Sequence, residues 1–349
     1  MSSPPSPGSV VGSPARKPPP RRRAWTWRNP NLRGWVYQAL ALLVLAGLIG
    51  WLARNTHVNM AARGIQSGWD FLLQTAGFDI GERPISFESV DPYWRAFLVG
   101  LLNTLRVAVV GIVLSTLIGI ALGVSRFSHN ALLRGLSYGY VETFRNVPIL
   151  VQLLLWYVLL LEGLPEATEP LTLPGGWFLS KAGLAFPWWR NGAEGWQWSL
   201  PVPEGFAFEG GLTLSPEYLA VLFGLVFYTA AFIAEVVRGG IAAVPRGQVE
   251  AAQSIGLSGA QTTRLVILPQ ALRVIVPPLT NQYLNLTKNS SLAVAIGYPD
   301  VVSIANTTLN QTGRAVECIA IVMAVYLTTS LATSALMNAW NRRVAIKER

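Results

Sequence analysis

Cysteine and histidine are nearly absent from this chain of 349 residues. The single cysteine, Cys318, permits neither a disulfide within the chain nor a thiolate metal site. The two histidines, His57 and His129, are too few for a histidine metal cluster. A Gly-x-x-x-x-Gly-Lys-Ser/Thr phosphate-binding loop is also missing. We therefore expect no metal, no cofactor, no bound ATP and no enzymatic activity of the chain itself.

Charged side chains are scarce as well. They make up 13% of the chain, against 51% hydrophobic residues, and the mean hydropathy is +0.39. A soluble domain needs more charge at its surface, so the composition indicates a membrane protein. The net charge of +9 is also compatible with nucleic-acid binding. However, the basic residues cluster in the tails and at the ends of apolar runs, which is typical of membrane topology signals, so we expect no nucleic-acid partner.

Six apolar runs approach the length of about 20 residues that a helix needs to cross a bilayer. They cover Trp35–Ala53, Phe97–Val124, Tyr138–Leu161, Tyr218–Val237, Leu272–Ala295 and Ile319–Trp340. The sequence therefore predicts an all-α polytopic membrane protein with about six transmembrane helices. Residues 35–53 form an N-terminal transmembrane helix in this interpretation, and residues 96–340 form the main transmembrane domain.

The distribution of charge predicts the orientation. Residues 1–34 are rich in proline, serine and arginine, which predicts a disordered tail, and residues 341–349 form a second basic tail. Because positive charge favours the cytoplasmic side, both termini are expected to be cytoplasmic, which requires an even number of spans. The basic N-terminal tail can also contact anionic lipid, an alternative that does not exclude the first.

Two long segments, residues 54–95 and 162–215, carry most of the acidic residues and are predicted to lie outside. In the first, Gly68–Leu73 is apolar but too short to span, so we expect it in the membrane interface. The second is rich in tryptophan and offers two interpretations. It is either an external platform for a partner or a tryptophan belt at the lipid headgroups.

A mildly polar loop at residues 240–270, between the fourth and fifth spans, is the most informative stretch. Gly256 is expected to turn the backbone with a positive φ, and Pro269 to begin or break a helix. Glu250 either caps a helix start or pairs with a cation on a partner. The spacing resembles the cytoplasmic coupling loop of ABC importer permeases, through which ATP-driven motion reaches the membrane domain. The residues that carry the resemblance are Glu250, Ala251, Ala252, Gly256, Leu268 and Pro269.

Other motifs are similar to those of permeases of the polar amino acid uptake group. They are Asn103–Leu105, Glu142–Pro148, Tyr228–Ile241 and Leu286–Leu292. The first span, with Asn55-Thr56 and Arg63–Ile65, resembles one of the two unlike permeases of general L-amino acid transporters.

This resemblance implies a five-helix importer core preceded by one additional helix, in the bacterial inner (plasma) membrane. It also implies ABC ATPase subunits, a second and unlike permease subunit, a soluble binding protein on the outer face, an amino acid substrate and contact with membrane lipid. The chain would then form half of a translocation pathway. An alternative from another class is an ion-gradient-driven secondary transporter of small polar solutes, which predicts broken helices and internal repeats with midplane acids. The sequence pattern shows neither feature.

Two groups of polar residues inside the spans are candidates for function. Glu235 and Arg238 stand three apart, so we expect an ion pair on one helix face, with a structural or gating role rather than substrate contact. Asn281, Asn285 and Lys288 share one side of the fifth span and are candidates for the translocation path. The alternative for these three residues is hydrogen bonding between helices.

Two glycine motifs have competing interpretations. Gly135-Leu-Ser-Tyr-Gly139 matches the nucleophile elbow of hydrolases, but a nucleophilic serine needs a nearby base. The two histidines do not supply one, because His57 is predicted to lie outside and His129 in a short inner loop. We expect these glycines to allow close helix packing instead. Gly119 and Gly123 form a small-residue motif that predicts the same kind of packing with an unidentified partner helix.

Overall fold

The computed structural model describes residues 30–344 apart from 63, 65, 66, 193 and 194. Most of the predicted tail at residues 1–34, and residues 345–349 of the second tail, lie outside the described residues. The chain divides into two units, residues 1–65 and 66–349. In the first unit, α1 (Pro30–Ala62) contains the predicted span 35–53 and continues to Ala62. The predicted outer segment, residues 54–95, is therefore helical over its first nine residues, although Arg54-Asn-Thr-His57 at its start are polar.

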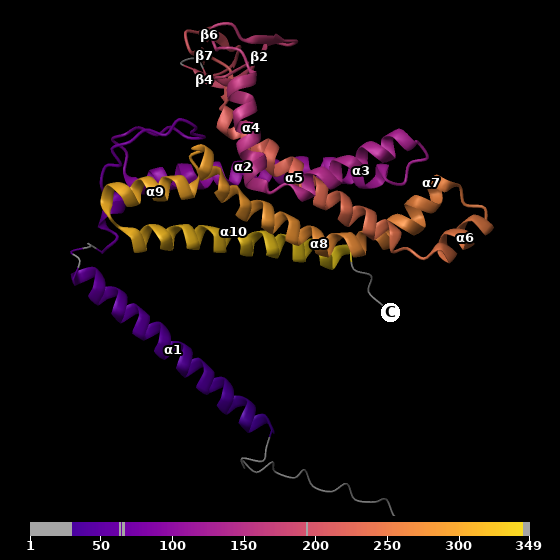
Figure 1. The fold of residues 1–349 in the computed structure, drawn as a ribbon, viewed down its shortest axis with the longest axis horizontal. Helices are drawn as coiled ribbons and strands as arrows, with labels where there is room; N and C mark the ends of the chain where they lie inside the picture. The colour runs from indigo at the N-terminus through magenta and orange to yellow at the C-terminus, as the bar shows by residue number, and fades with distance from the viewer. Residues whose placement is uncertain (1–29, 63, 65–66, 193–194, 345–349) are drawn as a thin grey trace, which may run out of the picture. The chain divides into compact units, whose positions relative to one another are not determined.

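Helices α2 (Tyr93–Ser125) and α5 (Pro216–Ala242) form the centre of the second unit. Glycine lets their backbones approach closely: a Cβ atom at Gly119 would lie 2.6 Å from Ile233 Cβ, and one at Gly123 would lie 2.7 Å from Val237 Cβ. The predicted packing motif is therefore confirmed, and its partner is another helix of the same chain. Along this pair run α8 (Leu268–Asn289), which packs on α5, and α10 (Ala315–Val344), which packs on α8 (Figure 1).

The prediction of one continuous third span, Tyr138–Leu161, is wrong. Two helices occupy this region, α3 (Ala131–Asn146) and α4 (Ile149–Gly163), and the chain bends by 106° between them. Pro148 explains the break, because proline has no N–H and disfavours a helical conformation in the preceding residue. This region therefore contains a broken helix, a feature that the sequence pattern did not show.

Gln152 supplies hydrogen-bond donors to two backbone carbonyl groups at the C-terminal end of α3. Its side-chain amide donates hydrogen bonds to the carbonyl oxygens of Phe144 and Val147, each at 2.9 Å. These carbonyls lie in the last turn of α3 and after it, where the helix offers no donors of its own. Gln152 is only 3% exposed, so the bend is part of the packed structure rather than a frayed end.

The predicted fifth span, Leu272–Ala295, corresponds to α8 and the 3₁₀ helix Ser290–Ile296 that continues it. Gly297 ends this segment with a φ of +77°, and α9 (Val301–Thr312) follows at a bend of 49°. Within the described residues, four helices are long and apolar enough to cross a membrane singly, or up to six if each bent pair is one span. The all-α polytopic fold of the bundle is confirmed.

The segment between α4 and α5 forms short β-strands, which the sequence analysis did not predict. Figure 1 shows these strands beyond the end of α4. A four-stranded antiparallel sheet has the order β1 (Leu171–Leu173), β2 (Trp177–Ser180), β3 (Gly183–Phe186), β8 (Leu212–Leu214). Two hairpins complete the segment: β4 (Trp188–Gly192) with β5 (Gly195–Ser199), and β6 (Val202–Glu204) with β7 (Ala207–Glu209). Trp188, Trp189, Trp196 and Trp198 of the first hairpin are all at least half exposed.

The outer segment before α2 is anchored on the bundle. It contains a 3₁₀ helix, Asp70–Leu73, in which Phe71 is 1% exposed and packs on the ring of Tyr93 at a centroid distance of 5.9 Å. Arg314, just before α10, pairs with the carboxylate of Asp70 at 3.2 Å. We expected this turn to lie in the membrane interface, but protein contacts hold its central apolar residue.

Candidate functional site

The predicted coupling residues lie in a compact helical excursion between α5 and α8. It consists of α6 (Arg246–Ser254), a turn at Gly256, α7 (Gly259–Thr262) and a π-helical turn, Thr263–Ile267, that leads into α8. Gly256 has a φ of +86°, as predicted, which a residue with a Cβ atom adopts only with strain. Figure 1 shows α6 and α7 together at one end of the bundle.

Local hydrogen bonds hold this excursion in shape. Ser258 and Gln261 form a capping box at the start of α7, so side chains satisfy exposed N–H groups there. The Gln270 amide in the first turn of α8 donates to the side chain of Gln248 in α6, and so ties the two ends of the excursion together. Pro269 is the second residue of α8 and follows the π-helical turn directly, so it marks the change from π-helical to α-helical backbone rather than the free start of a helix.

Glu250 does not cap a helix. It is the fifth residue of α6, whose N-cap is Pro245 and whose first turn contains no acid. The capping alternative is therefore wrong, because the helix begins one turn earlier than the Glu-Ala-Ala triplet. The carboxylate is exposed and forms no ion pair within the described part of the chain. It remains available for the other alternative, a cation on a partner.

Exposed apolar side chains lie on the same excursion as Glu250. Ile255 is 79% exposed, Leu265 61% and Leu268 46%, whereas Ala252 is buried at 4%. Apolar residues at this exposure, next to an unpaired acid, are typical of a surface that another protein covers. The excursion therefore has the composition of a docking surface with a small apolar centre and a charged edge.

The three candidate residues of the translocation path lie on the unpacked side of α8. Asn281, Asn285 and Lys288 are exposed, while the opposite side of the helix packs into the bundle through Ala271, Ile275, Val276, Leu279 and Tyr283. No hydrogen bond from these three side chains to another helix occurs within the described residues. Polar groups at membrane depth must contact protein or water, so this face requires a partner or an aqueous path.

Glu235 and Arg238 form the predicted ion pair in α5. The guanidinium Nε lies 2.9 Å from Glu235 Oε1, and a second nitrogen contacts the same carboxylate. The side chains remain 29% and 37% exposed, respectively, so the pair borders a surface rather than the core. The structural or gating role of the pair stays a prediction.

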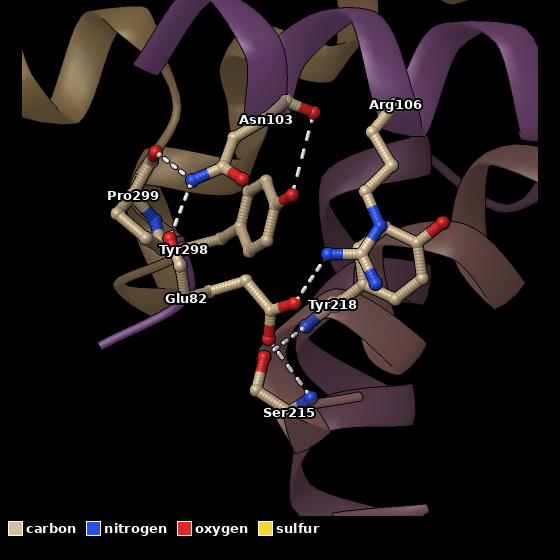
Figure 2. Close-up of polar contacts among 7 residues, drawn as sticks. All are labelled: Glu82, Asn103, Arg106, Ser215, Tyr218, Tyr298 and Pro299. Carbon is tan, nitrogen blue, oxygen red and sulfur yellow. Dashed lines mark hydrogen bonds and ion pairs between the residues drawn. The ribbon is translucent and has the colours of Figure 1, made fainter. Parts of the chain in front are cut away.

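A buried polar cluster that the sequence analysis missed lies where the outer segment meets α2 and α5 (Figure 2). Glu82 is 8% exposed, and its carboxylate accepts hydrogen bonds from Arg106 of α2 and from the backbone N–H of Ser215, the latter at 3.0 Å. The Arg106 guanidinium also lies over the ring of Tyr218, 4.4 Å from its centroid. A charge inside an apolar run was the signal for Arg106, because such charges seldom lack a partner.

Asn103, one turn before Arg106 on the same side of α2, extends this cluster. Its amide donates to the carbonyl oxygens of Glu82 at 2.7 Å and Pro299 at 2.9 Å, while Tyr298 donates to the Asn103 carbonyl (Figure 2). The neighbouring Thr104 hydroxyl accepts from the N–H of Val301 at 3.2 Å. Asn103 and Thr104 therefore join the outer segment, α2 and the start of α9. These contacts explain the polar Asn-Thr motif near the start of α2 by a structural role.

The Gly135–Gly139 motif does not form a nucleophile elbow. It lies within the continuous helix α3, and Ser137 donates to the carbonyl oxygen of Leu122 at 2.7 Å. The expectation that its glycines allow close packing is also wrong, since a Cβ atom at Gly135 or Gly139 would meet nothing within 4 Å. The packing glycines are those of α2.

Comparison with known proteins gives a consistent result. The profile of the family described as "binding-protein-dependent transport system inner membrane component" matches residues 115–346. The general L-amino acid transport system permease protein AapQ of Rhizobium johnstonii is 42% identical, over 93% of this chain and 96% of the relative. The glutamate/glutamine/aspartate/asparagine transport system permease protein BztB of Rhodobacter capsulatus is 37% identical, over 88% and 92%. A crystal structure of an amino acid ABC transporter with histidines superposes with a TM-score of 0.53 at 27% identity, over 72% of this chain and 95% of that one.

Proposed function

Because this chain belongs to the family of binding-protein-dependent transport system inner membrane components, we propose that it carries amino acids, with polar side chains among them, through a path lined by α8. The chain is a multi-pass inner membrane permease subunit of an ABC importer, a class that works with ATPase and binding-protein partners. The substrate class is proposed from the printed names of the relatives, which include general L-amino acid and glutamate permeases.

The polar face of α8 is the observation that carries the proposal. Asn281 and Asn285 present amides, and Lys288 presents a cation that attracts a carboxylate, which every amino acid substrate has. These side chains are exposed in the single chain, so they are open to a substrate or to a second subunit. Burying them against lipid would be costly, because an amide or ammonium in hydrocarbon lacks hydrogen-bond partners.

A second permease subunit completes the path in this proposal. The α8 face of one chain supplies half of an aqueous cavity, and the corresponding face of an unlike subunit supplies the other half. The first span, with Asn55-Thr56 and Arg63–Ile65, resembles one of the two unlike permeases of general L-amino acid transporters. This resemblance favours a heterodimer over a dimer of two identical chains. We divide this subunit into a main transmembrane domain at residues 96–340, which includes the outer insert at 162–215 and the coupling loop at 240–270.

Coupling to ATP hydrolysis takes place through the excursion between α5 and α8. Glu250 and the exposed apolar side chains around it dock into a groove of the ATPase, and the fixed turn at Gly256 keeps α6 at a constant angle to α7. Because the π-helical turn runs directly into α8, a displacement of α6 and α7 is transmitted to the helix with the polar face. Both termini and this excursion are then cytoplasmic, and a soluble binding protein delivers substrate at the opposite end.

Copurification from a membrane that contains the whole transporter tests the coupling surface. The native chain should recover an ATPase and a second permease, whereas Glu250→Arg should lose the ATPase and keep the permease. Glu166→Arg is the matched control, because it makes the same charge change on the exposed outer insert. Recovery of the ATPase with all three chains would refute the proposed role of Glu250. Absence of any ATPase with the native chain would refute the coupling surface altogether.

A further inference from the structure

A basic pocket of about 470 Å³ lies where α2 ends and α3 begins. Its charged lining consists of three arginines, Arg126, Arg134 and Arg238, and no acidic side chain lines it. Phe127 and Tyr138 supply aromatic surface at the same pocket. Such a volume accommodates a small anionic group together with the first atoms that are attached to it.

Positive charge exceeds the negative charge available around this pocket. Glu235 occupies one side of Arg238, and among the described residues the Arg134 guanidinium donates only to the backbone carbonyl of Ser128, at 3.0 Å. Arg126 lies over the ring of Tyr138, 4.9 Å from its centroid, which does not neutralise its charge. Three guanidinium groups therefore share one carboxylate.

Arg126 supplies the second observation. Its Nη1 atom is buried and has no hydrogen-bond partner within the described residues. Buried donors of a charged group are nearly always satisfied, so an unpaired one indicates a missing acceptor. Arginine presents its N–H groups as a planar fork, and phosphate oxygens match that geometry.

We propose that this pocket binds the phosphate group of an anionic membrane lipid. The pocket lies at the ends of membrane helices, where headgroups occur, and its aromatic side chains suit the boundary between headgroup and acyl chain. Figure 1 shows the α2–α3 turn at the same end of the bundle as α6 and α7. The assignment of the lipid to the cytoplasmic leaflet rests on the proposed function, because that function places this end of the bundle in the cytoplasm. The binding of the lipid itself does not depend on it. Basic pockets between membrane helices on that side suit anionic lipid headgroups.

Lipid retention measured by native mass spectrometry on the purified complex tests the proposal. The complex is extracted with equal amounts of phosphatidylglycerol and phosphatidylcholine, and the lipids that remain bound are counted. We expect phosphatidylglycerol to be retained by the native chain and by Arg343→Gln, an exposed arginine on α10 that does not line the pocket. Arg126→Gln and Arg134→Gln should reduce its retention at least severalfold, and Arg126→Lys should keep part of it.

Three outcomes would overturn the inference. Equal retention in all variants would show that no arginine of this pocket holds the lipid. Equal retention of the two lipids by the native chain would exclude selection of anionic headgroups. Loss of the lipid on adding millimolar inorganic phosphate, at constant ionic strength, would identify free phosphate as the ligand instead. Arg134 is exposed, so Arg134→Gln tests the site even if Arg126→Gln folds poorly, and ATPase copurification from the same samples reports separately on the proposed function.

Discussion

An ion pair between Glu82 and Arg106 fastens the outer segment to α2 at a buried position. The carboxylate is almost entirely buried, and the guanidinium lies between it and the ring of Tyr218. The same carboxylate accepts from the N–H of Ser215, the N-cap residue of α5. One acidic side chain thus connects a segment before α2, α2 itself and the start of α5.

Glu82→Ala should destabilise the protein by about 2–4 kcal/mol, because it leaves Arg106 with a poorly solvated charge and Ser215 with an unpaired N–H. Thermal unfolding of the purified protein measures the effect. Glu166→Ala is the control, since it breaks the exposed ion pair with Lys181, and we expect no change in melting temperature from it. An unchanged melting temperature for Glu82→Ala would show that Arg106 finds water or another acceptor once the carboxylate is gone.

Gly119 and Gly135 should respond in opposite directions to alanine. At Gly119 the new methyl group would overlap Ile233 and lie 3.0 Å from the carbonyl oxygen of Ala230, so α2 and α5 must separate. We expect a loss of about 1–3 kcal/mol of stability. At Gly135 the methyl group meets nothing, and the better helix propensity of alanine should add about 0.5–1 kcal/mol to the stability of α3. Unfolding curves of the two variants, recorded together, test both signs; a shared sign would contradict the packing described here.

Short-range features could be predicted from the sequence because their causes are local. The positive φ of Gly256 follows from its place between two short helices, and the Glu235–Arg238 pair follows from helical spacing. The glycine motif at Gly119 predicted close packing, although it could not identify α5 as the partner. The six apolar runs predicted where the apolar helices lie, since hydropathy reports burial in lipid directly. The described residues contain four helices that could span a membrane singly, or up to six if each bent pair is one span.

Features that depend on distant segments could not be predicted. Glu82 and Arg106 come together only when the outer segment folds over α2, so hydropathy places one outside and the other inside a span. The break at Pro148 was marked locally by the proline and by the polar residues Glu142, Arg145 and Asn146 before it, but the direction of α4 after the break depends on its packing against α5. The strands of the outer insert are three to five residues long and too short for a clear alternation of apolar and polar residues.

Gly256→Ala should uncouple transport while leaving the protein folded. A Cβ atom there meets no neighbour, so the only cost is the left-handed backbone conformation, about 1–2 kcal/mol, which the short turn can escape by rotating α6 against α7. We expect copurification with the ATPase or ATP-driven uptake to fall while the melting temperature of the bundle is retained. Gly259→Ala is the control, because Gly259 is the first residue of α7, lacks a positive φ and also has open space around it. Equal uptake by the two variants would show that the angle between α6 and α7 is not needed for coupling.

Lys288→Gln should weaken uptake of amino acids without weakening the bundle. The side chain is exposed on the polar face of α8 and forms no ion pair within the described residues, so its removal disturbs no packing. A hydrogen bond to a charged group contributes about 1.5–3 kcal/mol, which corresponds to a tenfold to hundredfold loss of transport efficiency if Lys288 meets the substrate carboxylate. Uptake of a labelled amino acid into vesicles with excess binding protein and ATP measures this, and Lys181→Gln on the outer insert makes the same charge change away from α8. Basal ATP hydrolysis distinguishes substrate contact by Lys288 from a role in the movement of α8. A loss of uptake with hydrolysis retained supports substrate contact. A parallel loss of uptake and hydrolysis would place Lys288 in the movement of α8 rather than in the translocation path.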